Sequence, residues 1–221
     1  IKGTKLTKEE KKLIINERPW GIILFKRNLF SFDQTRELIS AIKSITKDKK
    51  YPIMIDEEGG KVSRLSNYLD NKVYSQSFFG QLFKTNKKLG SNLYINYISS
   101  MSALLTTLGI NINTSPVLDI RKKKTHQIIG SRSYSFDKNI IKKLGKICLD
   151  TYSKNKIATV IKHIPGHGSA SSDSHKKLPV VKDTIKDLRK YDFSCFYNMN
   201  SFFAMTAHIL FTKIDSKKNV T

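Results

Sequence analysis

Short apolar runs alternate with amphipathic segments along most of the chain. A short continuous apolar run is typical of a strand buried on both faces, whereas apolar positions three and four residues apart are typical of a helix. The apolar runs lie at 20–25, 51–56, 109–120, 157–164 and 201–211. Because helical patterns separate these runs, the order predicts a parallel sheet whose strands are joined by helical crossovers.

One amphipathic segment precedes the first apolar run and the others separate the runs, at 6–17, 31–45, 89–108, 137–152 and 185–199. Three of these segments begin with residues that cap helices. Thr7 and Glu10 have the spacing of a capping box, and Asp33 and Asp137 are expected as N-caps of their helices. The third segment is expected to bury one face that carries Leu89, Leu93, Tyr97, Met101, Leu104 and Leu108.

Five parallel strands fit either an open doubly wound sheet or a TIM-type (β/α)8 barrel. Each predicted strand ends in polar or ionisable residues, namely 26–28, 56–58, Asp119, 162–163, and Thr206 with His208. Barrel enzymes draw their site residues from the carboxyl ends of several strands, whereas a nucleotide-binding sheet shows a Gly-rich turn after its first strand, which this sequence lacks. We therefore predict one α/β domain of the TIM-type (β/α)8 class, incomplete here, with about the first five strands present.

The charge of the chain changes this picture little. The formal net charge is +22 over 221 residues, and the basic residues are mostly lysines spread along the whole sequence. No basic cluster has the aromatic spacing of a single-strand binder, so we expect no specific nucleic-acid partner. The densest basic runs, at 47–50 and 121–126, are expected to be solvated loops.

The sequence also bears on the compartment. No apolar run approaches the roughly 20 residues that cross a bilayer, and residues 1–12 lack a signal-peptide pattern. Cys148 and Cys195 lie far apart in apolar surroundings, which is typical of reduced thiols in the cytosol. We expect a cytoplasmic protein without a membrane partner.

The segment 55–65 combines an acid, two glycines and an arginine. Asp56 closes an apolar strand, Gly59 and Gly60 permit a sharp turn, and Arg64 then lies within reach of the same rim. A carboxylate beside a guanidinium suits sugar hydroxyls or an acidic ligand group, but a structural ion pair fits equally well. Arg132, in a Gly/Ser loop, carries a weaker signal and fits a surface loop.

The segment 161–179 carries the densest candidate chemistry. Its glycines and proline exclude a helix, so His163 and His167 lose the geometry of a helical metal site. Asp173 and His175 are two residues apart, and a carboxylate that touches one imidazole nitrogen raises the basicity of the other. The pair predicts a general acid/base dyad, and a zinc hydrolase that uses both pairs is the competing interpretation.

Together, these segments resemble the β-N-acetylglucosaminidases of glycoside hydrolase family 3, of the NagZ type. The resemblance rests on "GIILFKRN", "IDEEGGKVSRL", "SPVLDI", "IGSRSYSFD", "KHIPGHGSASSDSHKKLP" and "MTAHI", in this order. It implies a TIM-type barrel and a retaining mechanism. The implied reaction is the removal of terminal N-acetylglucosamine from muropeptide fragments during cytoplasmic peptidoglycan recycling.

The resemblance also implies roles for individual residues. The positions that match sugar-binding residues of the family are Asp56, Arg64, Arg132, Lys162 and His163. His175 matches the general acid/base and Asp173 its partner, with no metal or other cofactor. A histidine in place of the usual second carboxylate departs from standard retaining glycosidases. His208, in the last motif, is either another rim residue or a core histidine.

Within the matched motifs the sequence departs from the family at three places: Glu57 replaces a usual Gln, Lys61 an Arg, and Ile164 a Phe. The larger departure is that the family's nucleophile, an Asp after the sixth strand, has no counterpart here. Asp192 falls in a helical pattern and Asp215 in a lysine-rich loop, so neither is expected to replace it.

We therefore interpret 1–221 as the N-terminal catalytic domain of the family, truncated at its carboxyl end. Without a nucleophile no covalent glycosyl-enzyme can form, so negligible hydrolysis is expected from these residues alone. A complementing C-terminal fragment is the partner that this interpretation implies. The alternative is a non-catalytic remnant or sugar-binding fragment.

Overall fold

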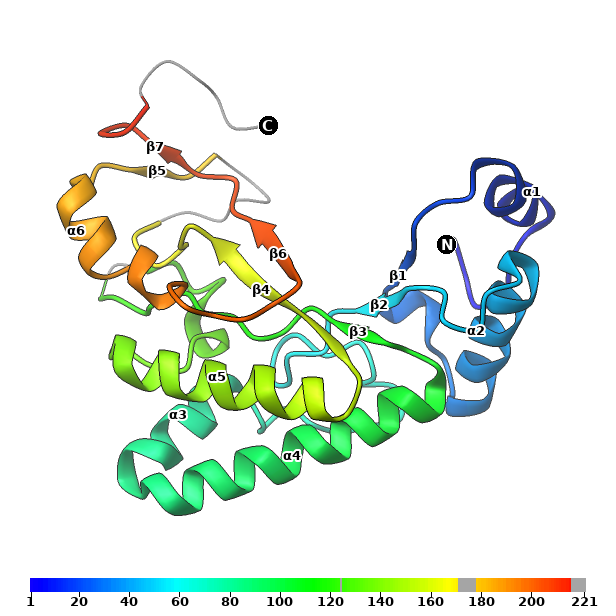
Figure 1. The fold of residues 1–221 in the computed structure, drawn as a ribbon, viewed down its shortest axis with the longest axis horizontal. Helices are drawn as coiled ribbons and strands as arrows, with labels where there is room; N and C mark the ends of the chain where they lie inside the picture. Colours follow the sequence, from blue (N-terminus) through cyan, green and yellow to red (C-terminus); the bar gives the residue numbers. More distant parts are fainter. Residues whose placement is uncertain (124, 171–177, 216–221) are drawn as a thin grey trace.

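The computed structural model describes residues 1–123, 125–170 and 178–215, and five parallel strands form its centre (Figure 1). They are β1 (Ile22–Leu24), β2 (Ile53–Ile55), β3 (Ile112–Asn113), β4 (Ala158–Ile164) and β6 (Phe203–Thr206). Their order in the sheet is their order in the chain, β1-β2-β3-β4-β6. The strands curl into a half-barrel, which confirms the predicted class of an incomplete (β/α) barrel.

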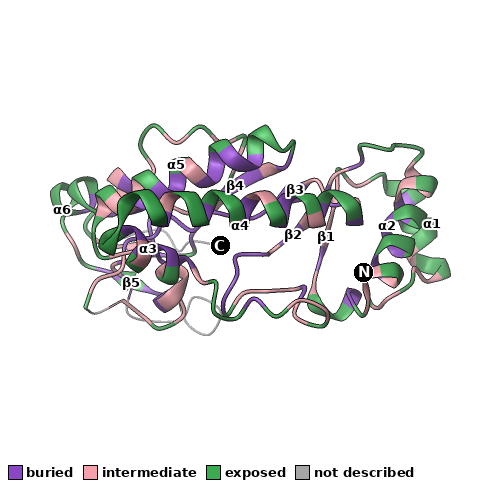
Figure 2. Cartoon of the chain, turned by 90° about the horizontal axis from the view of Figure 1, so that it is seen from below, coloured by how far each residue is buried: buried purple, intermediate pink, exposed green. Residues whose placement is uncertain are grey.

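Helices cover the outer side of this sheet. They are α1 (Lys8–Glu17), α2 (Phe32–Thr46), α3 (Gln76–Thr85), α4 (Lys87–Leu108), α5 (Lys138–Lys154) and α6 (Ile185–Lys190). The main core lies where the helices meet the strands, and Figure 2 shows buried residues gathered there. Leu24, Ile53 and Ile55 from the strands are fully buried against Ile42 of α2 and Leu105 of α4.

A second, smaller sheet flanks the half-barrel. It pairs β5 (Val180–Val181) with β7 (Leu210–Phe211) in parallel. A separate apolar cluster lies beneath it, formed by Ala170, Val181, Leu188, Ala207 and Ile209. The small sheet therefore joins the chain after residue 177 to the segment that follows β6.

Two helices differ from the prediction at their ends or faces. The side chain of Ser31, and not that of Asp33, caps α2 by accepting the N–H of Gln34 over 3.3 Å. Leu89 and Leu93 on α4 are exposed, whereas Met101 and Leu108 of the predicted face are buried, together with Tyr94, Ile98 and Leu105. The prediction also missed α3 as a separate helix.

Two further segments are more broken than predicted. The pattern at 185–199 forms only the six-residue α6 and a 3-10 turn at Phe193–Cys195. The apolar run 201–211 divides into β6, which joins the half-barrel, and β7, which joins the small sheet. In contrast, the capping box of Thr7 and Glu10 and the cap of Asp137 on α5 are confirmed.

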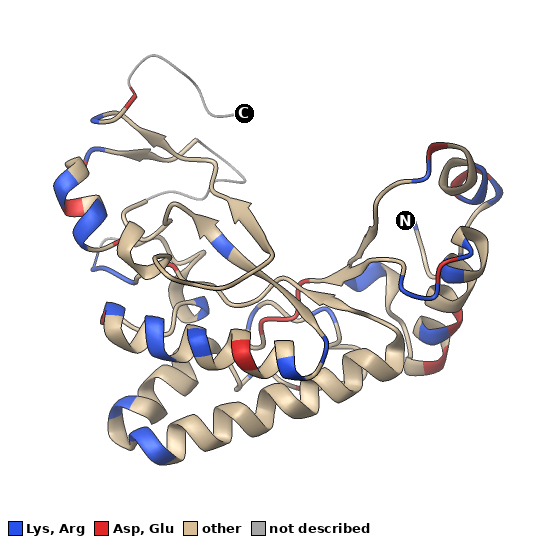
Figure 3. Ribbon diagram, in the orientation of Figure 1, with Lys and Arg blue, Asp and Glu red and all other residues tan. Residues whose placement is uncertain are grey.

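Lysine and arginine are spread over the outer helices α1, α2, α4, α5 and α6 (Figure 3). In the described part of the chain, no helix has both the length and the hydrophobicity needed to cross a membrane.

The capping of α2 can be tested directly. Ser31→Ala removes the side-chain acceptor for Gln34 N–H and is expected to lower the free energy of unfolding by about 1 kcal/mol. Asp33 lies in the first turn, where it contributes the smaller helix-dipole effect and an exposed ion pair with Arg36. Asp33→Ala is therefore expected to cost less than Ser31→Ala in urea unfolding, and the reverse order would contradict the assignment of the cap.

Candidate active site

The carboxyl ends of β2, β3 and β4 bring together a chain of charged side chains. Lys162 lies in β4, and its Nζ is 3.1 Å from Oδ1 of Asp56 and 2.5 Å from Oε1 of Glu58. It also donates to the hydroxyl of Thr114, just beyond β3, over 2.9 Å. The parallel order β2-β3-β4 explains this convergence, because the ends of neighbouring parallel strands lie along one edge.

The three consecutive acids after β2 divide between two sides of the backbone. Successive side chains of an extended chain point to opposite faces, so Asp56 and Glu58 face Lys162 together. Glu57 faces the other way and accepts the backbone N–H groups of Arg64 and Leu65 over 2.9 and 3.1 Å. Two acids thus belong to the charged centre and one shapes the turn beside it.

Burial and nearby cations act in opposite directions on these acids. Burial raises the pKa of Asp56, but the opposing effects of Lys162, Thr114 and Arg64 are larger. The pKa is therefore lowered overall, to about 2. Glu58 is nearly inaccessible, and Lys162 and Arg132 likewise outweigh burial and hold its pKa below the ordinary value. Both acids are therefore anions at neutral pH, and their charge is matched inside the site.

Arg132 extends the chain of charges toward His163. It donates to Glu58 through two nitrogens, Nε over 2.8 Å and Nη2 over 2.9 Å. This bidentate pairing fixes the plane of the guanidinium. Nη2 of Arg132 also lies 3.4 Å from Nε2 of His163. The solvated surface loop expected for Arg132 from spacing alone is wrong, since only 12% of its side chain is exposed.

His163 is oriented by a buried aspartate. Its Nδ1 lies 2.7 Å from Oδ2 of Asp119, which has no exposed surface. The other oxygen of Asp119 accepts the backbone N–H of His167 over 2.7 Å. Burial raises the pKa of Asp119, but His163 and the hydrogen bonds lower it overall. Because Asp119 accepts from Nδ1, Nε2 of His163 is the acceptor that faces Arg132.

Arg64 closes the site from the turn after β2. Its Nη2 lies 3.2 Å from Oδ2 of Asp56, as the spacing predicted. Its guanidinium also lies over the ring of Phe25, 5.6 Å from the centroid. Gly59 has φ +80, and a Cβ there would lie 2.3 Å from the carbonyl oxygen of Tyr74, so glycine is required for this turn.

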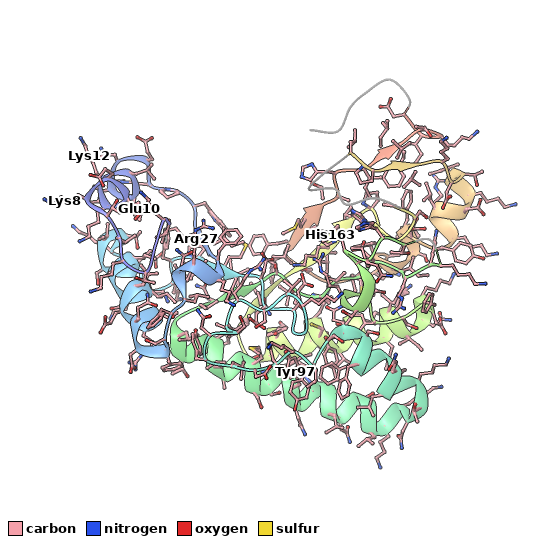
Figure 4. All side chains as sticks on the ribbon, turned by 180° about the vertical axis from the view of Figure 1, so that it is seen from behind. Lys8, Glu10, Lys12, Arg27, Tyr97 and His163 are labelled. Carbon is pink, nitrogen blue, oxygen red and sulfur yellow. The ribbon has the colours of Figure 1, made fainter. Side chains whose placement is uncertain are left out.

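The five positions that match sugar-binding residues therefore form one continuous cluster with Glu58 and Asp119. Asp173 and His175, the predicted dyad, lie outside the described residues. Figure 4 shows His163 on one side of the opening of the half-barrel and Arg27 on the other.

The polar end of β1 does not join the cluster as predicted. Asn28 is buried and binds the carbonyl oxygens of Ile1 and Gly3, and Nε of Arg27 also donates to Ile1. These residues hold the N-terminal segment in place. His208, after β6, is exposed, so the core-histidine alternative is wrong.

Spacing in the sequence did not single out Glu58 or Asp119 as site residues, although both were counted among the polar ends of the predicted strands. Their signal is the combination of an acid at a strand end with a cation at the end of a neighbouring strand. Thr114 left no signal, because it falls inside a predicted strand, where threonine is common.

The described residues contain no group of three or more His, Cys, Asp or Glu side chains placed to hold a metal ion. His163 is engaged with Asp119 and Arg132, and the rings of His163 and His167 are 6.0 Å apart. Two of the four ligands of the zinc interpretation, Asp173 and His175, fall outside the described residues.

The chemistry open to this cluster is polar recognition. Asp56, Glu58 and Asp119 each contact a cation or an imidazole, so each is an oriented acceptor and not a free nucleophile. Arg64 and His163 retain partial exposure at the mouth and can contact a ligand. Alternating donors and acceptors of this kind match the vicinal hydroxyls and amide of a sugar.

Asp56 links the site to the pH dependence of stability. Its pKa is lowered to about 2 in the folded protein, from 3.8 in the unfolded chain. The ionised carboxylate therefore contributes about 2 kcal/mol to the free energy of unfolding above pH 3.8, and this contribution is lost as the pH falls through 2. Asp56→Asn is expected to lose this amount at pH 7. Urea unfolding between pH 2 and pH 7 measures the difference, and a pH-independent gap between the two proteins would contradict the account.

The stability contribution of Glu57 depends on pH in the opposite direction. Burial raises its pKa despite four hydrogen-bond donors, so its contribution is full below the unfolded value and declines as the pH rises through the folded value. Glu57→Gln does not titrate and is expected to gain stability relative to the wild type as the pH rises from 4 to 8. Thermal unfolding across this range tests the sign, and Glu37→Gln, at an exposed carboxyl, is the control.

Comparisons with known proteins place this arrangement among related folds. A model of the family described as "Glycosyl hydrolase family 3 N terminal domain" matches residues 1–220. A beta-hexosaminidase of Idiomarina loihiensis is 30% identical over 217 residues, which cover 97% of this chain and 64% of that protein.

Two solved structures of NagZ from Neisseria gonorrhoeae also match. The native form superposes with a TM-score of 0.89 at 27% identity, covering 98% of this chain and 63% of the other. The complex with N-trifluoroacetyl-D-glucosamine superposes with a TM-score of 0.88. The chain thus spans slightly less than two thirds of the length of these relatives.

Proposed function

The chain belongs to glycosyl hydrolase family 3 through that family's N-terminal domain, and from this premise we propose that it carries the sugar-binding half of a retaining exo-β-N-acetylglucosaminidase. The observation that carries the proposal is the cluster Asp56–Lys162–Glu58–Arg132–His163, formed at the carboxyl ends of β2 and β4 and by the connection after β3. A glycosidase site needs fixed partners for several hydroxyls of one sugar ring, and the ion pairs of this cluster hold such partners in place.

The sugar is N-acetylglucosamine. A related protein, NagZ from Neisseria gonorrhoeae, is known in complex with an N-acylated glucosamine, and we transfer this ligand class to the present chain. Arg64, Asp56 and His163 are partly exposed at the mouth and would contact the ring directly. Lys162 and Glu58 lie beneath them and hold them in place.

The proton is handled by a dyad from the segment after β4. In this proposal His175 protonates the glycosidic oxygen as the bond to the anomeric carbon breaks, and Asp173 stabilises the resulting imidazole tautomer. In the second half of a retaining reaction the same imidazole takes a proton from water as it attacks the glycosyl-enzyme. The nucleophile of the first half has no counterpart in the sequence.

The substrate is an N-acetylglucosamine-containing muropeptide fragment in the cytoplasm. The motif resemblance supports the peptidoglycan role, and the two cysteines support a reducing compartment. Cys148 and Cys195 are both buried and reduced in the structure, and burial raises the pKa of Cys195 to about 12. A thiol of this kind is inert as a nucleophile.

The 221 residues, acting alone, are expected to bind the sugar without hydrolysing its glycosides. Turnover requires the remaining strands of the barrel with their nucleophilic Asp, supplied as a complementing C-terminal fragment. The alternative function is that of a sugar-binding remnant, which shares the binding site but gains no activity from such a fragment.

Binding and turnover can be measured separately. We expect N-acetylglucosamine to bind the chain in ligand-observed NMR, and Arg132→Met to weaken this binding by about tenfold or more, since it removes the bidentate partner of Glu58. Arg189→Met makes the same change at an exposed position of α6 and is the control. If the wild type did not bind N-acetylglucosamine, the proposal would fail.

Hydrolysis of an aryl N-acetyl-β-glucosaminide is expected to stay at background for the chain alone. Adding a polypeptide with the remaining barrel strands and their Asp is expected to produce turnover. Turnover by the unassisted chain would contradict the assignment of the missing nucleophile. Binding without turnover in the mixture would favour the sugar-binding remnant.

A further inference from the structure

An aromatic ring at the end of β1 lies beside the candidate active site. The guanidinium carbon of Arg64 is 5.6 Å from the centroid of the Phe25 ring, and that of Arg27 is 4.9 Å from it. Phe25 directly follows β1, and Figure 4 shows Arg27 across the opening from His163. The polar end of β1 stays outside the charged cluster, but its aromatic residue contacts one of the groups proposed to bind the sugar.

The backbone around Phe25 is held by hydrogen bonds and by the core. The backbone N–H of Phe25 donates to Oδ1 of Asn28 over 2.9 Å, and Asn28 is buried. Nδ2 of Asn28 donates in turn to the carbonyl oxygens of Ile1 and Gly3 over 3.0 and 2.8 Å. Leu24, one residue before the ring, is fully buried in the main core. The ring is therefore presented from a rigid part of the fold.

Arg64 is held by fewer hydrogen bonds than the other arginine of the site. Nη2 of Arg64 donates to Asp56 over 3.2 Å, and in the described part of the chain this carboxylate is the one acceptor of its guanidinium. Nε of Arg64 is buried and has no hydrogen-bond partner among the same residues. Arg132, in contrast, binds Glu58 through two nitrogens, which fixes its plane. A single contact leaves the guanidinium of Arg64 free to turn about it.

A neighbouring aromatic face supplies the constraint that the single hydrogen bond lacks. A guanidinium is planar and weakly hydrated, so it stacks on aromatic rings, and the ring quadrupole attracts its charge. The side chain of Arg64 is 28% exposed, and this attraction is stronger in a partly desolvated position than at an open surface. The ring of Phe25 and the carboxylate of Asp56 thus act on one guanidinium from the ends of β1 and β2.

We propose that Phe25 is a positioning residue for Arg64. Its ring holds the guanidinium in the orientation that binds Asp56 and leaves the remaining edge at the mouth, where the sugar contacts it. The inference rests on the proposed function, because the sugar is the ligand that Arg64 is proposed to bind. It assigns no contact with the sugar to Phe25.

The contact itself can be observed in the wild-type chain. The Nε–Hε and Cδ–Hδ signals of Arg64 are assigned by NMR from their loss in Arg64→Lys. We expect the ring current of Phe25 to shift at least one of these protons upfield, and Phe25→Leu to remove that shift. Arg64 signals that are the same in the wild type and in Phe25→Leu would overturn the proposal.

The effect on binding is measured with N-acetylglucosamine as the probe. Phe25→Leu keeps an apolar side chain but removes the ring, and it is expected to weaken binding about threefold or more. Phe25→Tyr keeps the ring face and is expected to retain both the wild-type affinity and the upfield shift at Arg64. Weaker binding in the first variant, restored in the second, supports the proposal.

Phe136→Leu is the matched control. The guanidinium carbon of Arg121 lies 4.6 Å from the centroid of the Phe136 ring, so this substitution removes a similar contact outside the charged cluster. It is expected to leave the affinity for N-acetylglucosamine at the wild-type value. Phe25→Met replaces Phe25→Leu as the deciding variant if the latter does not give the amide dispersion of a folded protein.

Failure of this inference is distinguishable from failure of the proposed function. If the wild type binds N-acetylglucosamine and the folded variant without the ring binds it equally well, the positioning role is wrong and the proposed function stands. If the wild type itself does not bind the sugar, the proposed function is wrong, and the positioning role is wrong with it.

Discussion

The contact of the Lys162 ammonium with two carboxylates is the interaction on which the charged site depends. Lys162 is almost fully buried, and it lies 3.1 Å from Asp56 and 2.5 Å from Glu58. Neither acid could stay ionised in this position without a cation, because an uncompensated buried charge is strongly unfavourable. The positions of Arg64 and Arg132 follow, since each binds one of the same two acids.

Sugar binding and proton transfer are assigned to different parts of the half-barrel. Of the groups proposed to bind the sugar, Asp56, Lys162 and His163 lie at or directly after β2 and β4, and the two arginines lie in the connections that follow β2 and β3. The proposed acid/base residues, Asp173 and His175, come from the segment between β4 and β5 in the sequence. Binding groups near the strand ends and a proton donor from another connection suit a reaction in which binding and proton transfer occur at different atoms.

The features that sequence analysis predicted are those set by local pattern. Buried strands, the Thr7–Glu10 capping box and the Asp137 cap each depend on neighbouring residues, and all three were confirmed. The prediction of Asp33 as the cap of α2, where the structure has Ser31, was wrong because both residue types cap well and only the entry direction of the chain decides. The predicted buried face of α4 was wrong at Leu89 and Leu93 for a related reason, since an apolar residue at helical spacing is buried only where another element covers it.

The candidate site likewise contains residues that a local pattern predicts and residues that it does not. Asp56 and Arg64 were predicted as a pair from one short turn, and the structure joins them. Arg132 was expected in a solvated loop because its partner Glu58 lies 74 residues away in sequence, a distance that no local pattern bridges. The family resemblance identified Arg132, but it gave no reason for its position. The reason is the parallel order of the strands, which places β2, whose end carries Glu58, beside β3, whose following connection carries Arg132.

The most direct test of the central claim is a map of where N-acetylglucosamine binds, from amide chemical-shift changes in the 221-residue chain. The account predicts that the changes centre on 56–64, Arg132 and 162–163. A separate cavity of about 960 Å³ lies outside the half-barrel between α3 and α5, lined in part by Lys84, Arg121 and Lys143. Changes confined to that cavity, with none at the ends of β2 and β4, would contradict the account.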